Sequence, residues 1–505
     1  MLVKIWLSNK KGIIFRLQMV WLLILCLGLT IIPGRLPVEA ATIPGTIRVG
    51  VVQNCSTIDF GSKQGIYKIV DAKTGQTIVD SASKGALFRA KIDRNFFQIE
   101  LFEYVGQGDS DFSQPGAAAL VDGWKLKGAY NGPIRLVGIE DESRDNNATL
   151  PRLVLCESKR YRGQLEIRIN ANRSGLTGIN ELPFEEYLYG VVAKEMSAGW
   201  PPEALKAQAI IARTYAAQNL GRHSSESFNI CATTNCQVYG GYDSEDQSLN
   251  RLVGETKGQV LVDNQGRLAV TLYHSNSGGY TENNVNVFGA DIDYLQGGPD
   301  PYSLSHVLSD WSYATVVNGK NNRNEDGLRN LLMKDNSSVG LIESIELIKY
   351  PSGRVNTVII HDDQGNNITV TGATFSGLFN PNNTVGKDQV MGRLFDISTD
   401  ASITMVNSGG GKVTQHGGIR DLAVVTNGGI NQKLSEVESS YYVVGANGKY
   451  SRPKDPTTLD FQGHGWGHGV GLSQWGAYEM AKQGFKHNEI LDFYYPGTKL
   501  ILGNR

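Results

Sequence analysis

The alternation of apolar and polar residues predicts strands in the first third of the chain and a pair of helices after them. Residues 46–53 (TIRVGVVQ) alternate with the period of a strand, and similar runs continue to about residue 175, many of them separated by Asn or Gly. Within residues 184–196, Leu188, Val191 and Val192 follow the spacing of one helix face. Pro201-Pro202 then opens a second predicted helix, which ends at Gly221.

From about residue 255 to 460 the pattern again indicates strands, such as QVLVD, RVNTVIIHD and YYVVG. Near the C-terminus, residues 473–483 are predicted to form a helix that Gly484 closes, and Asn488 is expected to cap a last short helix, NEILDFYY. The 59 glycines suit a structure rich in strands and turns. The fold class predicted is therefore α+β: a large mixed or antiparallel β body with a few helices carrying the active-site cleft.

The first forty residues have the layout of a secretory signal peptide. Basic residues precede an apolar run over residues 17–32, and small residues follow near Ala41. The run is short for a membrane span, which needs about 20 residues, although an uncleaved N-terminal anchor is the alternative. We therefore expect an exported protein of the periplasm, cell wall or cell exterior.

The predicted divisions of the chain are a signal or anchor at 1–40, a β-rich region at 41–175, a catalytic core at 176–300, a second β-rich region at 301–460, and a block at 461–505 that completes the core.

The charge of the chain is nearly balanced. It has 48 Lys and Arg against 50 Asp and Glu, for a formal net charge of −2. No basic stripe of the kind that nucleic acids bind is visible in the sequence. A nucleic-acid partner is therefore not expected.

Glu195 is the candidate catalytic acid. It lies seven residues after Leu188, on the apolar face of the first predicted helix and just before Trp200-Pro201-Pro202. Burial disfavours the charged form of a carboxyl and raises its pKa, and an acid with a raised pKa can protonate a glycosidic oxygen. The plainer interpretation is a half-exposed glutamate paired with a cation. Glu185 and Glu186 are expected on the solvated side of the same helix.

Three sequence blocks resemble the SpoIID/LytB (stage II sporulation protein D) family. They are LPFEEYLYGVVAKEMSAGWPPEALKAQAIIARTYA at 182–216, TLYHSNSGGYTENN at 271–284, and GHGWGHGVGLSQWGAYEMAKQG at 463–484 with ILDFYYPGT at 490–498. The resemblance implies a lytic transglycosylase that acts on peptidoglycan glycan strands, with Glu195 as its essential acid. In such enzymes the C6 hydroxyl of the substrate attacks the anomeric carbon and leaves a 1,6-anhydro end, so one acid that later acts as base can suffice. The alternative, from the LytB branch, is a non-catalytic wall-binding protein that enhances a separate amidase.

The second and third blocks supply the candidate substrate-binding residues. Strand alternation places Tyr273, Ser275 and Ser277 on one side and His274 on the other. Paired glycines allow a bulge or a close approach of ligand, and the glycines around the two histidines of the third block favour a loop over a helix. The alternative is that these glycines are structural and that the tryptophan is part of the core. The candidates are Tyr273, His274, Ser275, Ser277, Gly278, Gly279, Thr281, His464, His468, Gln474 and Trp475.

Cys231 and Cys236 raise the question of a metal. The resemblance implies zinc at this place in some relatives, but Asn235 stands where those relatives have a histidine. With His223, three candidate ligands are visible, whereas a closed structural zinc site needs about four. A Cys231–Cys236 disulfide and free thiols are the alternatives. No cofactor is therefore expected, and a zinc-dependent hydrolase is disfavoured for the same reason.

Overall fold

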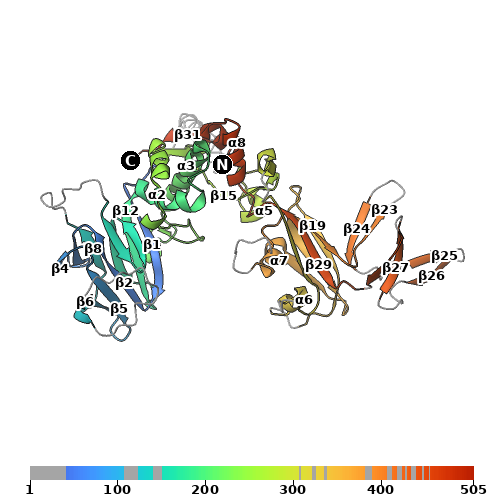
Figure 1. Cartoon of the computed structure of the whole chain (residues 1–505), viewed down its shortest axis with the longest axis horizontal. Helices are drawn as coiled ribbons and strands as arrows, with labels where there is room; N and C mark the ends of the chain where they lie inside the picture. Colours follow the sequence, from blue (N-terminus) through green and yellow to red (C-terminus); the bar gives the residue numbers. More distant parts are fainter. Residues whose placement is uncertain are drawn as a thin grey trace, which may run out of the picture.

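The computed structural model describes residues 41–106, 123–139, 151–305, 309–320, 326–334, 338–380, 389–406, 412–417, 423–426, 429–433, 440–445, 448–453 and 455–504. The predicted signal peptide or anchor at 1–40 lies outside the described residues. The α+β class is confirmed, because several antiparallel sheets are combined with separate helices. Figure 1 shows a β lobe at each end of the molecule and a helical core between them. In the described part of the chain, no helix is both long and apolar enough to cross a membrane.

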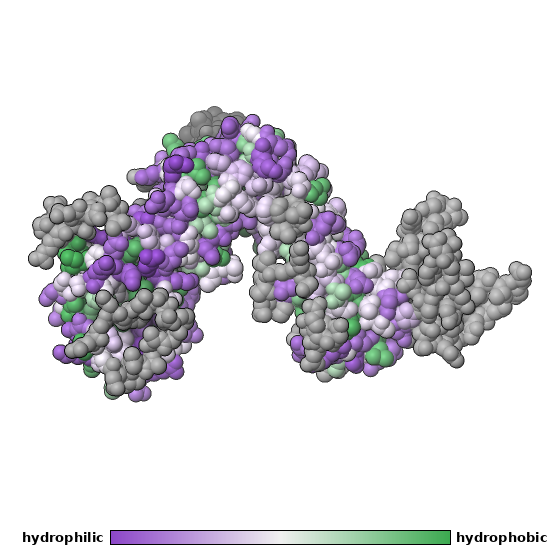
Figure 2. All heavy atoms as spheres, viewed as in Figure 1, coloured by the Kyte–Doolittle hydropathy of each residue, from purple (hydrophilic) through white to green (hydrophobic). Residues whose placement is uncertain are grey.

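The N-terminal lobe consists of two sheets. The seven-stranded sheet has the order β13 (Ile230–Cys231), β1 (Thr46–Cys55), β12 (Leu176–Pro183), β11 (Gln164–Ile169), β8 (Ile134–Gly138), β3 (Tyr67–Asp71), β4 (Thr77–Ala82). The six-stranded sheet has the order β10 (Lys159–Arg162), β9 (Leu153–Cys156), β2 (Thr57–Gln64), β5 (Leu87–Asp93), β6 (Gln98–Tyr104), β7 (Trp124–Tyr130). In β1 the alternation predicted from the sequence places Ile47 and Val49 in the main hydrophobic core. The visible face of this lobe is mainly hydrophilic, with apolar residues scattered across it (Figure 2).

The helical core carries the segments with the family-like motifs. Its helices are α2 (Phe184–Glu195), α3 (Pro202–Gln218), α4 (Gln247–Glu255), α5 (Asn284–Phe288), α8 (Gln474–Lys482) and α9 (His487–Tyr494). Its short strand pairs are β14 (Gln259–Val262) with β31 (Lys499–Leu502), β15 (Tyr273–His274) with β30 (Leu472–Ser473), and β16 (Tyr280–Thr281) with β17 (Gly298–Pro299). The parallel pairing of β15 and β30 brings the second and third sequence blocks side by side, although almost 200 residues separate them.

Four predicted helices are confirmed, with one correction at a helix start. Pro202 begins α3, as expected from the missing N–H of proline. The last helix begins at His487, with Lys486 at the N-cap, so Asn488 is not its cap. The reason is local: the carboxylate of Glu489 accepts the backbone N–H of Lys486 at 2.7 Å, and this bond fixes the start two residues earlier.

Most of the second β lobe is formed by the part of the chain that follows the second sequence block and precedes the third. A three-stranded sheet has the order β18 (Asp310–Val316), β29 (Thr458–His464), β22 (Phe395–Thr399). A five-stranded sheet has the order β21 (Asn367–Thr371), β20 (Val355–Asp362), β19 (Ile342–Lys349), β24 (Lys412–Gly417), β23 (Ile403–Val406). The remaining elements are α6 (Leu328–Met333), α7 (Gly372–Leu378), and the hairpins β25 (Ala423–Thr426) with β26 (Gly429–Lys433) and β27 (Ser440–Gly445) with β28 (Gly448–Pro453). This lobe has a hydrophobic core of its own.

Candidate active site around Glu195

Glu195 is the last residue of α2. The helix ends there because Met196 adopts an extended conformation, and the chain then turns towards Pro201 at the start of α3. The neighbouring helix residues Val191 and Val192 are buried, whereas the side chain of Glu195 keeps partial exposure. The predicted position, at a helix end beside the apolar core, is confirmed.

Two neutral side chains hydrogen-bond the carboxylate of Glu195. The hydroxyl of Tyr273 donates to Oε1 at 3.0 Å, and the amide nitrogen of Gln474 donates to Oε2 at 3.4 Å. Tyr273 comes from β15, and Gln474 follows the paired strand β30. The parallel strand pair thus positions both donors at the end of α2.

The surroundings of Glu195 raise its pKa. Burial disfavours the charged carboxylate and is the largest effect, while the hydrogen bonds from Tyr273 and Gln474 and the nearby charge of Lys194 act in the opposite direction. The net result is a pKa above the ordinary value for glutamate. Such a group keeps its proton to a higher pH than an exposed glutamate does, and it can also carry the negative charge that remains after the proton is given away.

Three aromatic rings lie beside this group of residues. Trp200, between α2 and α3, contacts Trp475 and Tyr478 of α8, with ring centroids 4.5 and 5.1 Å apart respectively. All three side chains are partly exposed. Because Trp475 directly follows Gln474, the aromatic cluster adjoins the carboxylate that Gln474 contacts.

His274 and His468 lie on the opposite side of β15 from Glu195. Their ring centroids are 5.4 Å apart, and Nδ1 of His274 lies 3.1 Å from the carbonyl oxygen of Val470. Burial lowers the pKa of both rings, that of His468 to about 4. The predicted alternation of Tyr273 and His274 is confirmed, and it separates these neutral imidazoles from the acid. His464, by contrast, is exposed and pairs with Asp310 at 2.8 Å.

The two glycines of the second block lie close to other parts of the protein, Gly278 to backbone and Gly279 to the side chain of Leu304. Gly278 and Gly279 have φ of 69° and 98°, which favours glycine. A Cβ on Gly278 would lie 2.9 Å from the backbone nitrogen of Gly465, so the close approach involves the glycine-rich third block. The remaining candidates of this block use their hydroxyls or backbone within the protein: Ser277 donates to Asp300 at 2.6 Å, Thr281 donates to the Gly298 carbonyl at 3.1 Å, and the Ser275 carbonyl accepts from Trp475 at 3.0 Å.

Arg354 of the second lobe was not found by the sequence analysis. Its side chain is only 2% exposed, and its guanidinium donates to the carbonyl oxygens of Ser277 and Tyr280, each at 2.7 Å. It therefore holds the turn that follows β15. The sequence contains no signal for this role, because Arg354 lies in an ordinary turn more than 70 residues from its partners.

Glu185 is not on a solvated face, and that prediction was wrong. It forms a two-pronged ion pair with the fully buried Arg213 of α3: Nη2 lies 2.8 Å from Oε2, and Nε lies 3.1 Å from Oε1. The reason is that Arg213 lies on the buried face of α3, where its charge needs a counter-ion. Glu186, its neighbour, lies 3.8 Å from Arg162 and remains half-exposed.

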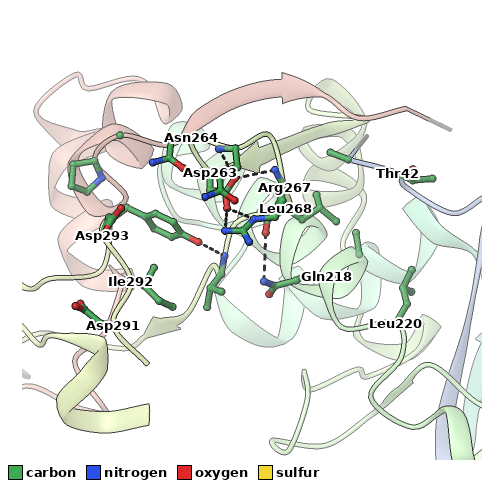
Figure 3. A pocket seen from close by; sticks show the side chains of 17 residues that line it. Thr42, Gln218, Leu220, Asp263, Asn264, Arg267, Leu268, Asp291, Ile292 and Asp293 are labelled. Carbon is green, nitrogen blue, oxygen red and sulfur yellow. Dashed lines mark hydrogen bonds and ion pairs between the residues drawn. The ribbon is translucent and has the colours of Figure 1, made fainter. Parts of the chain in front are cut away.

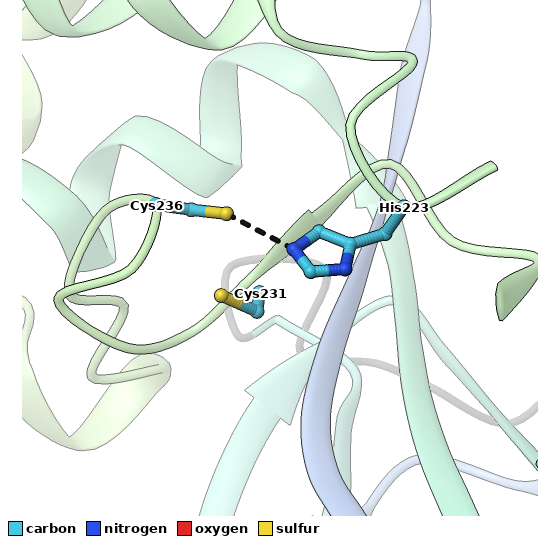
Figure 4. Close-up of side chains that lie close together, drawn as sticks. All are labelled: His223, Cys231 and Cys236. Carbon is cyan, nitrogen blue, oxygen red and sulfur yellow. Dashed lines mark hydrogen bonds between the residues drawn. The ribbon is translucent and has the colours of Figure 1, made fainter. Parts of the chain in front are cut away.

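His223, Cys231 and Cys236 come together, with their ligand atoms all within 4.8 Å of one another (Figure 4). Nε2 of His223 lies 3.3 Å from the sulfur of Cys236, and Nδ1 lies 2.8 Å from the carboxylate of Glu226. The cysteines of the described residues are free thiols, so the Cys231–Cys236 disulfide is not formed.

The same cluster fits a zinc ion with three protein ligands, because a carboxylate behind a histidine is a usual way to orient a metal-bound imidazole. Burial pushes the pKa of Cys231 upward, but hydrogen bonds that include those from Thr233 and Asn235 outweigh burial and bring it to about 7. If zinc is bound, His223, Cys231 and Cys236 would hold it, and the ion would tether the loop that joins them.

A cavity of about 850 Å³ lies elsewhere, beyond the end of α3 (Figure 3). Several of its lining residues contact one another: Arg267 pairs with Asp263 at 2.7 Å, and the hydroxyl of Tyr294 accepts the backbone N–H of Val270 at 2.8 Å. Glu195, Tyr273 and Gln474 are not among its lining residues. The cavity is therefore separate from the candidate active site.

Comparison of the sequence with known proteins identifies a matching family and several relatives. Residues 172–262 match the family described as SpoIID, stage II sporulation protein. The amidase enhancer of Bacillus subtilis is 30% identical over 377 residues, which are 70% of this chain and 46% of that protein, so the chain spans less than half of its length. Stage II sporulation protein D of the same organism is 26% identical over 349 residues, covering 66% of this chain and 79% of that protein. An uncharacterised protein of Brachyspira hyodysenteriae is 28% identical over 330 residues, covering 65% and 69%.

Proposed function

The chain belongs to the SpoIID/LytB family, and on that premise we propose that it is a lytic transglycosylase that cleaves peptidoglycan glycan strands with Glu195 as acid and base. The observation that carries this proposal is the half-buried carboxyl of Glu195, with a raised pKa, between the neutral donors Tyr273 and Gln474. A peptidoglycan-related function follows from the family. The transglycosylase reaction itself is the proposal.

The reaction needs a single carboxyl group of the protein, which first donates a proton to the substrate and later takes one back. Protonated Glu195 gives its proton to the glycosidic oxygen between N-acetylmuramic acid and N-acetylglucosamine as the C1–O bond breaks. The C6 hydroxyl of the same muramic acid then attacks C1, and its proton passes to the Glu195 carboxylate. The product has a 1,6-anhydro ring, and Glu195 returns to its protonated form. The side chains that hydrogen-bond Glu195 are neutral, so neither of them can take over the proton during this cycle.

Tyr273 and Gln474 favour the intermediate state of this cycle. When Glu195 has lost its proton, both side chains donate hydrogen bonds to the resulting carboxylate. Hydrogen bonds to a charged acceptor are stronger than those to a neutral one. The two donors therefore stabilise the carboxylate that must persist until the C6 hydroxyl reacts.

The aromatic cluster supports a saccharide substrate. Trp200, Trp475 and Tyr478 present partly exposed rings next to the acid. Aromatic rings bury large apolar area with defined geometry, which suits the flat C–H faces of sugar rings. The glycan strand is proposed to lie across these rings, with the bond to be cleaved at Glu195.

A second candidate function is enhancement of a separate cell-wall amidase. The observation that favours it is the 30% identity with the amidase enhancer of Bacillus subtilis. In this case the partner would be an amidase together with the wall, and Glu195 would have no chemical role.

For either function we propose that the protein is exported, because the basic and apolar pattern of residues 1–40 is that of a secretory signal.

The experiment compares the unmodified protein with Glu195→Gln on purified glycan strands, intact and peptide-stripped, with mass spectrometry of the products. Glutamine keeps the size of the side chain but cannot donate a carboxylic proton, so anhydro-muropeptide formation should fall by at least about 10²–10⁴-fold. Glu186→Gln, on the same helix, is the matched control and should keep the activity. Equal yields from the unmodified protein and Glu195→Gln would exclude Glu195 from the mechanism. Absence of anhydro product from the unmodified protein on every strand, with stimulation of an added amidase, would favour the second candidate.

A further inference from the structure

A buried amide side chain, Gln237, lies behind the hydrogen bond between Tyr273 and Glu195. It is 2% exposed and follows Cys236 in the loop after β13. Its Oε1 accepts the hydroxyl proton of Tyr187 at 3.1 Å, and its Nε2 lies 3.3 Å from the carbonyl oxygen of Ala212 and 3.4 Å from the hydroxyl oxygen of Tyr273. Both ends of the amide are thus occupied in the interior of the protein.

The contact with Ala212 fixes which end of the amide is the nitrogen. A backbone carbonyl can only accept a hydrogen bond, so the atom of Gln237 that faces it must be the donor Nε2. The same Nε2 donates its other hydrogen to the hydroxyl oxygen of Tyr273. Tyr273 has a single hydroxyl proton, which is then left for Oε1 of Glu195.

The three hydrogen bonds therefore run in one direction, from Tyr187 through Gln237 and Tyr273 to Glu195. Each donor in such a chain polarises the next, which strengthens the last bond of the series. If the Gln237 amide were absent, the hydroxyl of Tyr273 would be free to rotate its proton away from Glu195. The amide thus removes an alternative orientation from the phenol that contacts the acid.

We propose that Gln237 is a positioning residue for the glycan-cleaving reaction: it directs the hydroxyl proton of Tyr273 onto Glu195. This inference rests on the proposed function of Glu195 as acid and base. Gln237 does not touch the reacting carboxyl, and it acts through Tyr273. Its contribution is greatest when Glu195 is a carboxylate, because only then does the acceptor carry a full charge.

The loop that carries Gln237 is held on both sides. Before it, the backbone N–H of Cys236 donates to the Thr233 carbonyl at 3.0 Å, next to the His223–Cys231–Cys236 cluster. After it, the hydroxyl of Tyr239 donates to Asn180 of β12 at 3.0 Å. The amide is therefore supported by the surrounding fold, as a group that orients another must be.

The test combines Gln237→Met, Tyr273→Phe and the double variant. Methionine matches glutamine in length and lacks its hydrogen bonds. We expect Gln237→Met to lower the rate of anhydro-product formation by about two- to tenfold, because the bond lost is one between neutral groups, which is worth up to roughly one power of ten. In the Tyr273→Phe background the same substitution should change the rate little, since its route to Glu195 is gone. Gln218→Met, at the exposed end of α3, is the matched control.

A second readout does not depend on activity. The carboxyl carbon of Glu195 can be observed by ¹³C NMR in protein labelled at glutamate and assigned by its loss in Glu195→Gln. Gln237→Met should raise the pKa of Glu195, because it weakens a hydrogen bond that favours the carboxylate. If the unmodified protein makes no anhydro product, the proposed function fails, and the titration alone decides whether Gln237 acts on Glu195.

Two results would overturn the proposal. One is a titration of Glu195 that is the same in Gln237→Met and in the unmodified protein. The other is a double variant whose rate loss is the product of the two single losses, which indicates independent structural effects. Should Gln237→Met not fold, Gln237→Leu also lacks the amide donor and adds no charge, and the same shift of the Glu195 titration is expected.

Discussion

The hydroxyl of Tyr273 donates a hydrogen bond to Oε1 of Glu195 at 3.0 Å, although the two residues lie 78 positions apart in the chain. Glu195 is placed by the end of a helix, and Tyr273 by a two-residue strand. Burial favours the protonated form of Glu195, whereas this hydrogen bond favours the carboxylate. The pair is suited to a group that must release a proton and later recover it.

The first prediction concerns the pH dependence of glycan cleavage. The first step needs protonated Glu195, so the rate should fall as pH rises through the pKa of this group. Because that pKa lies above the ordinary value, the fall should begin at higher pH than for a solvent-exposed glutamate. Tyr273→Phe removes a donor that favours the carboxylate, which raises the pKa further and should move the alkaline limb to still higher pH while lowering the maximal rate. Initial rates measured across pH provide the check.

Tyr302→Phe is the control for this prediction. Tyr302 makes ring contacts with Phe485 and Phe493, which phenylalanine preserves. Its pH profile should match that of the unmodified protein. A Tyr273→Phe profile shifted to lower pH would contradict the argument, because it would mean that the phenol favours the protonated acid.

The second prediction concerns the ion pair between Glu185 and Arg213. Arg213 has no exposed surface, so Glu185→Gln leaves a buried guanidinium without its counter-charge. Breaking a buried pair in this way costs about 3–5 kcal/mol of unfolding free energy. Urea denaturation measures it, with Glu186→Gln as control, because the half-exposed Glu186 is 3.8 Å from its partner and such pairs contribute about 0–1 kcal/mol. Equal midpoints for the two variants would show that Arg213 does not depend on Glu185.

The position of Glu195 in its helix could be predicted from the sequence. The contacts that Tyr273 and Gln474 make with it could not. The helical spacing from Leu188 and the following Trp200-Pro201-Pro202 segment locate Glu195 at the end of α2, which is a local property. Tyr273 and Gln474 were named as binding candidates, but only the parallel pairing of β15 with β30 places both against the acid. Sequence periodicity describes faces of single elements and does not identify which elements meet.

Glu185, Gln237 and Arg354 illustrate why the remainder was missed. Each is a polar residue whose role depends on a partner in another element: Arg213 for Glu185, Tyr273 for Gln237, and Ser277 for Arg354. Polar residues in such positions follow the pattern of solvated surface when they are seen in sequence alone. Their burial becomes evident only when the elements are packed.

The third prediction concerns metal removal. Cys231 packs in a small cluster with Ile179 and Phe228, and Cys236 packs against both this cluster and the main hydrophobic core. Even if zinc is held by His223, Cys231 and Cys236, most of the main core is formed by residues outside this cluster. Chelation with EDTA should therefore change the melting temperature by about 2 °C or less, which for a domain of this size corresponds to roughly 1 kcal/mol. Calorimetry with metal analysis before and after chelation checks this, and loss of stoichiometric zinc with a much larger decrease would contradict it.

The last prediction concerns stability in acid. Glu203, in the first turn of α3, accepts hydrogen bonds from the backbone N–H and the ring Nδ1 of His487 at 2.9 and 2.7 Å, and from Lys206 at 3.2 Å. Burial alone would raise the pKa of Glu203, but the bonds from His487 and Lys206 outweigh it and bring the pKa to about 2, against 4.5 for an unperturbed glutamate. Because the folded-state pKa is lowered, the stabilisation is fully present above pH 4.5 and is lost as pH falls towards 2.

Glu203→Gln tests this directly. At neutral pH it should lower the unfolding free energy by about 1–2 kcal/mol, since a charged acceptor that joins α3 to α9 is replaced by a neutral one. As pH falls below 4.5, Glu203 becomes protonated in the unfolded chain while it stays charged in the folded protein down to about pH 2, so the difference between the two proteins should shrink steadily as the pH is lowered. Urea unfolding at several pH values between 3 and 7 measures the difference, with the exposed Glu346→Gln as a control expected to stay within about 0.5 kcal/mol. A difference that remains constant over this range would show that the contact between Glu203 and His487 depends on shape and not on charge.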